Sequence, residues 1–258
     1  MFETPAGAES LAGQIATHVN FDAEAARALV ERFGIINLPT VVVLGGDGQE
    51  IDRVQGYEEK DAWLEEMSAA LRANNPIPTL EERARTHPDD AAAQLELGWR
   101  LLVRGDVARG EVLLERAILL DADDRAGHAS EALFVLGRFY QRVKLDFRTG
   151  RNIWRELATR YPRSERALTA LSWWAKAEAE LGHVDLGAEI LRRAAQAEGA
   201  TPDHVVLWAS YARKRGVDRQ PALAAVDAVL PAATGETAEE LRELREALSA
   251  PAASAPAH

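Results

Sequence analysis

Histidines, an acidic run and a glycine-rich turn are the features of this sequence whose residue types could carry chemistry. The acidic run DADD, residues 121–124, begins like a calcium-binding loop, but Ala132 stands where the bidentate glutamate is required. The turn LGGDG, residues 44–48, is followed by a strand pattern, whereas a phosphate loop needs a helix there. No two of the six histidines have the spacing of a helical zinc motif; they are His18, His87, His128, His183, His204 and His258. We therefore predict no metal site, no catalytic residue and no cofactor. We predict that residues 121–124 form a turn between two helices.

Composition narrows the functions further. The 258 residues include no cysteine, so the chain can form no disulfide, thiolate nucleophile or dithiol redox cycle. A net charge of -11 disfavours nucleic acid and anionic membranes as partners, and no apolar run approaches the ~20 residues of a membrane span. The start, MFETPAGAES, lacks the basic and apolar regions of an export signal. We expect a cytoplasmic protein, or a periplasmic one if an export signal lies upstream of this sequence.

The first 73 residues predict an α/β segment with the element order β, α, β, hairpin, β, α. QIATHV (14–19) predicts a strand, and the helix expected at 23–33 has an apolar side formed by Ala26, Leu29, Val30 and Phe33. The continuous apolar run LPTVVVL (38–44) predicts a strand buried on both faces, and QEIDRVQGY (49–57) predicts the second strand of a hairpin. An amphipathic helix at 59–72 closes the segment.

Helical periodicity follows to about residue 249, and the helical part repeats itself. NNPIP marks a linker at residues 74–79. We predict helical repeats at 80–232, a capping helix at 233–249 and a disordered tail at 250–258. Leu97, Gly98, Leu101, Gly105, Gly110, Leu114 and Ala117 correspond, 77 residues later, to Trp174, Ala175, Glu178, Gly182, Gly187, Leu191 and Ala194. A further shift of 34 residues reaches Trp208, Ala209, Ala212 and Gly216.

Physical reasons support this spacing. Small residues such as Gly98, Ala175 and Ala209 let antiparallel helices approach closely, and Trp154, Trp174 and Trp208 are expected in the core between helices. Gly105, Gly182 and Gly216 can adopt the positive φ that ends a helix, and Pro221 can begin one. The 34-residue period resembles that of tetratricopeptide repeats, over about residues 80–230.

The resemblance implies that the first helix of each pair lines a concave groove. The residues expected there are Trp99, Phe134, Arg138, Arg142, Lys176, Arg213 and Lys214. This basic and aromatic groove suits a protein ligand or an extended acidic peptide, although ordinary solvated charge would give the same pattern. The carboxylate-clamp pattern of chaperone-binding repeats is absent.

Residues 1–72 resemble the C-terminal half of a thioredoxin-like domain of the thiol:disulfide interchange type. The matching features are Phe33-Gly34, Leu38-Pro39-Thr40 at the cis-proline position, the hairpin, and Gly56. The resemblance implies that Leu38, Pro39 and Thr40 form a peptide-binding ledge; the alternative is that they only pack. The family's C-x-x-C half has no counterpart, and neither has the strand that would lie between residues 14–19 and 38–44.

Three arrangements accommodate the missing strand: an upstream segment, a strand from another chain, or a rearranged sheet. Unpaired edges would favour self-association. We expect an α/β plus all-α protein, in which a partial thioredoxin-like segment is followed by a tetratricopeptide-type solenoid. We expect it to act as a non-catalytic protein-binding module, and a chaperone-like role is the more specific form of this prediction. An alternative function is that the chain is the truncated remainder of a thiol oxidoreductase. An in-frame C-x-x-C encoded in the DNA upstream of Met1 would support this alternative. Another is a structural scaffold, favoured if the groove residues pack against the first segment.

Overall fold

The chain forms two compact units, described here from a computed structural model that covers residues 14–56, 60–72 and 76–250. The division falls between Asp146 and Phe147, so the first helices of the helical part belong to the same unit as the strands. The predicted linker at 74–79 lies inside this unit, and a helix already begins at Ile77. The tail predicted at 250–258 lies, apart from Ala250, outside the described residues.

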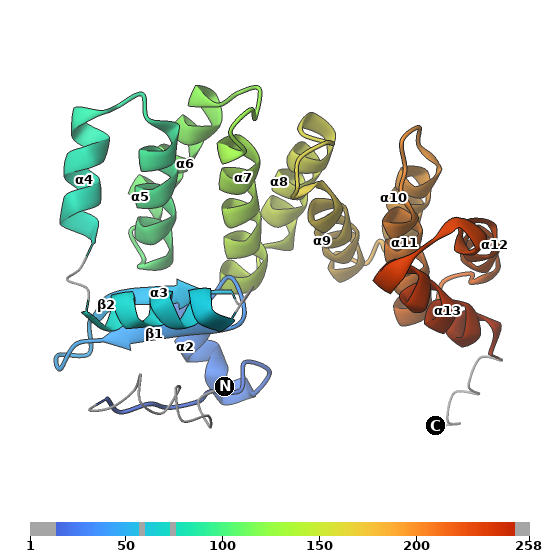
Figure 1. The fold of residues 1–258 in the computed structure, drawn as a ribbon, viewed down its shortest axis with the longest axis horizontal. Helices are drawn as coiled ribbons and strands as arrows, with labels where there is room; N and C mark the ends of the chain where they lie inside the picture. The colour runs from blue at the N-terminus through green and yellow to red at the C-terminus, as the bar shows by residue number, and fades with distance from the viewer. Residues whose placement is uncertain (1–13, 57–59, 73–75, 251–258) are drawn as a thin grey trace. The chain divides into compact units, whose positions relative to one another are not determined.

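The first unit places a β-hairpin beside a set of helices (Figure 1). Its elements are η1 (Glu24–Ala26), α2 (Arg27–Arg32), β1 (Thr40–Leu44), β2 (Glu50–Gln55), α3 (Lys60–Arg72), α4 (Ile77–Thr86), α5 (Ala91–Val103), α6 (Val107–Leu120), α7 (His128–Arg138) and the π-helical segment η2 (Phe139–Lys144). The second unit is helical: α8 (Phe147–Arg160), α9 (Ala167–Glu180), α10 (Val184–Gln196), α11 (Pro202–Arg215), α12 (Gln220–Val229), η3 (Leu230–Ala232) and α13 (Gly235–Ser249).

The hairpin forms as the sequence predicts. β1 and β2 pair antiparallel from Thr40 opposite Gln55 to Leu44 opposite Glu50. The amphipathic helix α3 packs on one face of the hairpin, because its apolar side chains meet those of the strands. The buried members of this cluster are Val43, Val54, Trp63, Met67 and Ala70.

Two predictions for this segment are wrong. Residues 14–19 form no strand, and Ile15 is 99% exposed. β1 is not buried on both faces, since Leu44 is 43% exposed and Val43 is its only buried member. Both errors have one cause: among the described residues the sheet has two strands, so no third strand covers β1 or pairs with residues 14–19. Over η1 and α2 the buried face is narrower than expected, with Ala26 of η1 and Val30 of α2 buried but Leu29 38% exposed.

The helical pairs owe their close packing to small residues. A Cβ atom added to Gly110 of α6 would lie 2.8 Å from the carbonyl oxygen of Gly98 in α5, so only glycine allows this crossing. In the second unit, a Cβ on Gly187 of α10 would lie 2.8 Å from the carbonyl oxygen of Ala175 in α9. The two crossings occupy positions 77 residues apart, as the repeat pattern predicts. Gly105, Gly182 and Gly216 have the expected positive φ, at 97°, 87° and 69°.

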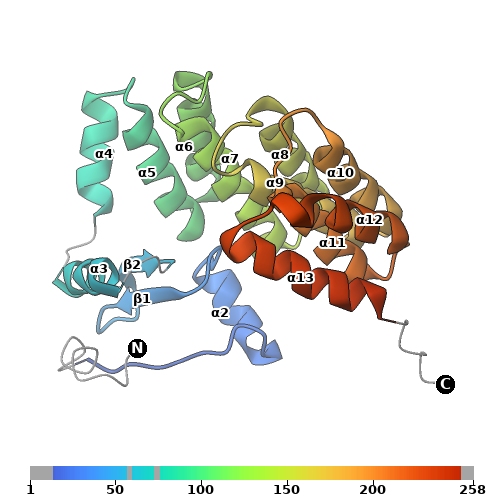
Figure 2. The ribbon, with the colours of Figure 1, turned by 45° about the vertical axis from the view of Figure 1, so that its right-hand side comes forward.

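The C-terminal helices pack together within the second unit (Figure 2). Pro221 lies in the first turn of α12, where its missing N–H costs no hydrogen bond. The predicted capping helix is α13, and its apolar stripe of Ala238, Leu241, Leu244 and Leu248 is buried. No helix in the described part of the chain is long and apolar enough to span a membrane.

The tryptophans partly follow prediction. Trp154 is fully buried and Trp208 is 4% exposed, whereas Trp174 is only partly buried. Trp173, next to Trp174 in the sequence, stacks on Trp154 with 6.0 Å between ring centroids. Residues 121–124 form the predicted turn between α6 and α7, in which Asp121 accepts a hydrogen bond from the backbone N–H of His128 at 2.9 Å.

Candidate protein-interaction site

Two arginines near the C-terminal end of α5 form the centre of the candidate site. Arg100 and Arg104 are four residues apart, so their side chains leave the helix on the same face. Cations are also favourable at this end of a helix, because its last carbonyl groups carry partial negative charge. α5 therefore presents two aligned guanidinium groups to whatever packs against it.

Strand β2 supplies the groups that these arginines contact. Val43 pairs with Asp52 while Leu44 pairs with Glu50, so Ile51 is an extra residue in a β-bulge. In a regular strand, residues three apart point to opposite faces. The bulge instead lets the Arg53 Nε donate to Glu50 Oε1 at 2.7 Å, and both side chains are buried, 1% and 8% exposed.

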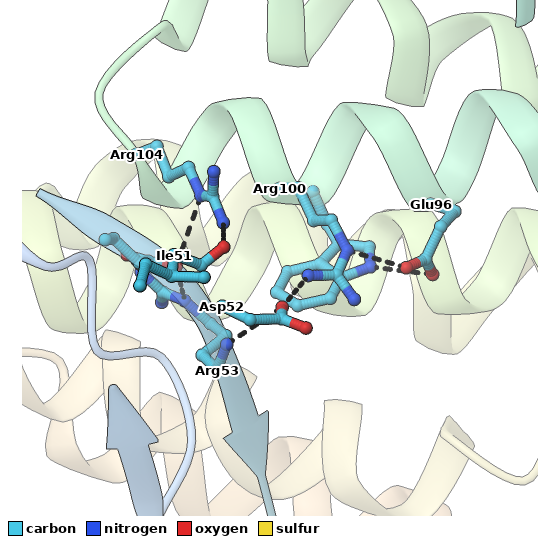
Figure 3. Close-up of polar contacts among 8 residues, drawn as sticks. Ile51, Asp52, Arg53, Glu96, Arg100 and Arg104 are labelled. Carbon is cyan, nitrogen blue, oxygen red and sulfur yellow. Dashed lines mark hydrogen bonds and ion pairs between the residues drawn. The ribbon is translucent and has the colours of Figure 1, made fainter. Parts of the chain in front are cut away.

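We call the resulting network the α5–β2 contact, comprising Glu50, Ile51, Asp52, Arg53, Glu96, Arg100 and Arg104. Figure 3 shows Arg100 and Arg104 reaching from α5 to the strand. Arg100 donates to Asp52, and its Nε donates to Glu96 on its own helix at 2.7 Å. Arg104 donates to the Glu50 carboxylate at 3.2 Å and to the Ile51 carbonyl oxygen at 3.0 Å. α5 thus binds two carboxylates and one backbone carbonyl along three successive residues of an extended strand.

The pKa values of the two arginines shift in opposite directions. Burial lowers the pKa of Arg104, and Glu50 offsets this only in part. Burial also lowers the pKa of Arg100, but its hydrogen bonds and attraction to Glu96 and Asp52 outweigh the effect, so its pKa lies above the usual value. Both arginines are 15% exposed, so water screens the pairs less than it screens surface ion pairs. We infer that the pairs hold the hairpin firmly to α5.

The segment before β1 is bound to the neighbouring helix in a similar way. Arg138 on α7 donates to the carbonyl oxygen of Ile36 at 2.8 Å, and Arg142 on η2 donates to the same oxygen at 3.3 Å. In return, Arg27 of α2 donates to the carbonyl oxygens of Arg142, at 2.7 Å, and of Val143. Burial lowers the pKa of Arg142, with partial compensation from Asp22.

Four predicted groove residues belong to the first unit, and their surroundings correct the prediction of an open groove. Phe134 is 5% exposed, so it is a core residue rather than a ligand contact. Arg138 and Arg142 contact Ile36 of the same chain. Trp99 is partly buried, donates to Glu96 at 3.1 Å and lies under the guanidinium of Arg100. The groove prediction fails here because the chain's own first segment occupies the face.

The other three predicted groove residues lie on the second unit and are exposed. Lys176 of α9 stands over the ring of Trp173, with its Nζ 4.5 Å from the ring centroid. Arg213 and Lys214 lie near the end of α11, which an ion pair of 2.8 Å between Arg215 and Glu180 joins to α9. All three cations are exposed at the surface of α9 and α11, and their role in a groove stays a prediction.

The predicted peptide-binding ledge lies at the start of β1. The bond between Leu38 and Pro39 is cis, and the Leu38 side chain is 46% exposed. Thr40 is partly buried, and its hydroxyl donates to the carbonyl oxygen of Asn37 at 2.7 Å. The position is accessible, and its ligand role stays a prediction.

Sequence inspection missed the residues that form the α5–β2 contact. A signal was present: two arginines four apart on a helix, and two acidic residues two apart on a strand. No local pattern, however, indicates that Arg100 contacts Asp52, which is 48 positions away in the sequence, or that Arg104 contacts Glu50, which is 54 positions away. Within the described residues no cluster of histidine and acidic side chains could hold a metal ion.

Comparisons with known proteins do not identify a family. Models of protein families, curated proteins and solved structures were all searched, and none matches this chain.

Proposed function

We propose that this chain is a non-catalytic protein-binding module, in which tetratricopeptide-type helices carry a thioredoxin-like segment and bind an extended acidic segment of a partner. The observation that carries the proposal is the α5–β2 contact. There, Arg100 and Arg104 bind an extended strand through the carboxylates of Asp52 and Glu50 and through the Ile51 carbonyl oxygen. The face of a first helix in this chain thus has the chemistry needed to hold an extended acidic ligand.

The second unit is the proposed place for a partner. The corresponding face of the first unit is occupied internally, which supports the structural scaffold interpretation for that unit. On α9 and α11, by contrast, Lys176, Arg213 and Lys214 are exposed. An extended acidic segment lying across these helices would pair with the three cations, and screening by salt would weaken the binding.

Fluorescence anisotropy tests the proposal. The probe is a labelled peptide of alternating glutamate and isoleucine, and its lysine counterpart is the control peptide. We expect the acidic peptide to bind at low salt, and the double change Arg213→Glu with Lys214→Glu to weaken binding by about tenfold or more. Arg193→Glu is the control, because this cation lies on the second helix α10 with a side chain 76% exposed. Equal loss in the control, or no binding by the unaltered chain, would contradict the proposal.

A chaperone-like role is the more specific form of the proposal. If the second unit holds extended segments of unfolding proteins, excess chain suppresses aggregation of a thermally unfolding client, as measured by light scattering. The Arg213→Glu, Lys214→Glu variant should suppress less. No suppression by the unaltered chain would reject the chaperone role and leave peptide binding to be decided by anisotropy.

A further inference from the structure

The outer edge of β1 presents backbone hydrogen-bonding groups with no strand beside them in the described part of the chain. Gly56 N donates to the Pro39 oxygen at 2.8 Å, which marks residues 39 and 56 as a hydrogen-bonded pair. In an antiparallel ladder such pairs alternate, so Val41 and Val43 bond to β2. The N–H and C=O groups of Thr40 and Val42 therefore point away from β2.

No other strand among the described residues pairs with this edge. The sheet order is β1–β2, and α3 packs on a face of the hairpin. Residues 14–20 are exposed and form no strand, so they do not pair with β1. The edge of β2 is different, because Arg104 donates to the Ile51 carbonyl oxygen there; β2 lies between β1 and α5 (Figure 1).

β1 also lacks the features that protect natural sheet edges. Exposed edges are usually interrupted by charge, proline or a bulge. β1 reads TVVVL, with no charged residue and no proline, and the extra residue of the bulge, Ile51, lies on β2. β2, by contrast, carries Glu50, Asp52 and Arg53. The unprotected edge is therefore suited to pairing with another strand.

We propose that β1 pairs antiparallel with β1 of a second copy of this chain, with Val42 opposite Val42 on a two-fold axis and Thr40 opposite Leu44. The edge is self-complementary, because this register places only uncharged side chains opposite one another and uses all five residues of each strand. The result is a four-stranded sheet in which each copy satisfies the outward groups of the other. Each chain has a net charge of -11, so added salt should strengthen the dimer by screening the repulsion between copies.

The mass in solution, measured by light scattering after size exclusion, tests the pairing. We expect twice the chain mass of 28.2 kDa, with the dimer fraction rising with salt. Val42→Lys should shift the mass to that of one chain, since two ammonium groups would face each other on the axis. Leu119→Lys makes the same change at a 74% exposed position of α6 and should leave the dimer intact. A single-chain mass for the unaltered protein at every concentration and salt would overturn the proposal, and so would a dimer that Val42→Lys leaves unchanged.

A single introduced cysteine tests the register. The chain has no cysteine of its own, so Val42→Cys supplies one thiol per copy. Directly opposed residues of a hydrogen-bonded antiparallel pair have Cα atoms about 5.5 Å apart, which disulfides tolerate. Mild oxidation should give a disulfide-linked dimer for Val42→Cys and little for Leu119→Cys. Equal cross-linking of the two variants, or none at Val42→Cys in a sample that is dimeric, would contradict the register.

Discussion

Gly34 lies directly against the backbone of Val103: a Cβ atom on Gly34 would be 2.4 Å from the Val103 carbonyl oxygen. Gly34 ends the turn after α2, and Val103 is the last residue of α5. The Gly34 φ of 54° is also strained for residues with side chains. Two constraints therefore select glycine at the point where the first segment meets α5.

Gly34→Ala should loosen the first segment from α5. We expect a loss of about 2–4 kcal/mol of stability, from the left-handed backbone conformation and from overpacking against Val103. Chemical denaturation followed by circular dichroism measures the loss, and hydrogen exchange should show reduced protection of the amides of β2.

Gly48→Ala is the matched control. Gly48 has a φ of 75°, so it carries the conformational cost, but the nearest atom to an added Cβ would be Arg32 Nη2 at 3.9 Å. The Gly48→Ala change should cost about 1–2 kcal/mol of stability, without the reduced protection of the β2 amides that is expected for Gly34→Ala. Equal losses for the two variants would mean that close packing on Val103 adds nothing.

Asp52→Asn should destabilise the chain more than the loss of a surface ion pair. The substitution would leave the Arg100 guanidinium, 15% exposed, without one of its two carboxylate partners. We expect a loss of about 2 kcal/mol, since leaving one member of a largely buried pair without its partner is costly. The free energy of unfolding in urea measures it.

Glu82→Gln provides the comparison on α4. Its ion pair with Arg85 has side chains 60% and 70% exposed, so its removal should leave the free energy of unfolding almost unchanged. A double mutant cycle of Asp52→Asn with Arg100→Met isolates the coupling between the two residues. A coupling energy near zero would contradict the role given to the α5–β2 contact.

Local patterns predicted the elements because each depends on neighbours in the sequence. The hairpin follows from LGGDG between two strand patterns, and the tight crossings follow from Gly98 and Ala175 in repeated positions. The strand at residues 14–19 failed because β-branched residues form a strand only where another strand pairs with them. The residue types of a segment do not show whether a second strand lies beside it.

The contacts of the candidate site were harder to predict than the helices and strands. The charges of Arg138 and Arg142 were expected on a helical face, but their partner, the Ile36 carbonyl oxygen, is 102 and 106 residues away and carries no side-chain signal. Glu178 shows the same limit: it stands where the first unit has Leu101, yet it is 4% exposed. It accepts a hydrogen bond from Trp174 at 3.3 Å and lies 2.9 Å from the His183 Nδ1. The charged side chain of Glu178 gave no indication in the sequence that this residue is buried.

Tyr140 should make stability depend on alkaline pH. Burial and then the hydrogen bond to Glu111 raise the pKa of Tyr140 from 10.0 to about 12. The folded state therefore holds the phenol proton at a pH where the unfolded chain has released it, so the contribution to stability is complete below pH 10 and disappears as pH rises to about 12. Stability measured by urea unfolding should fall more steeply between these pH values in the unaltered chain than in Tyr140→Phe. Glu111→Gln should lower the pKa of Tyr140, seen as earlier phenolate absorbance, and identical pH profiles for all three proteins would show that Tyr140 is not held in this way.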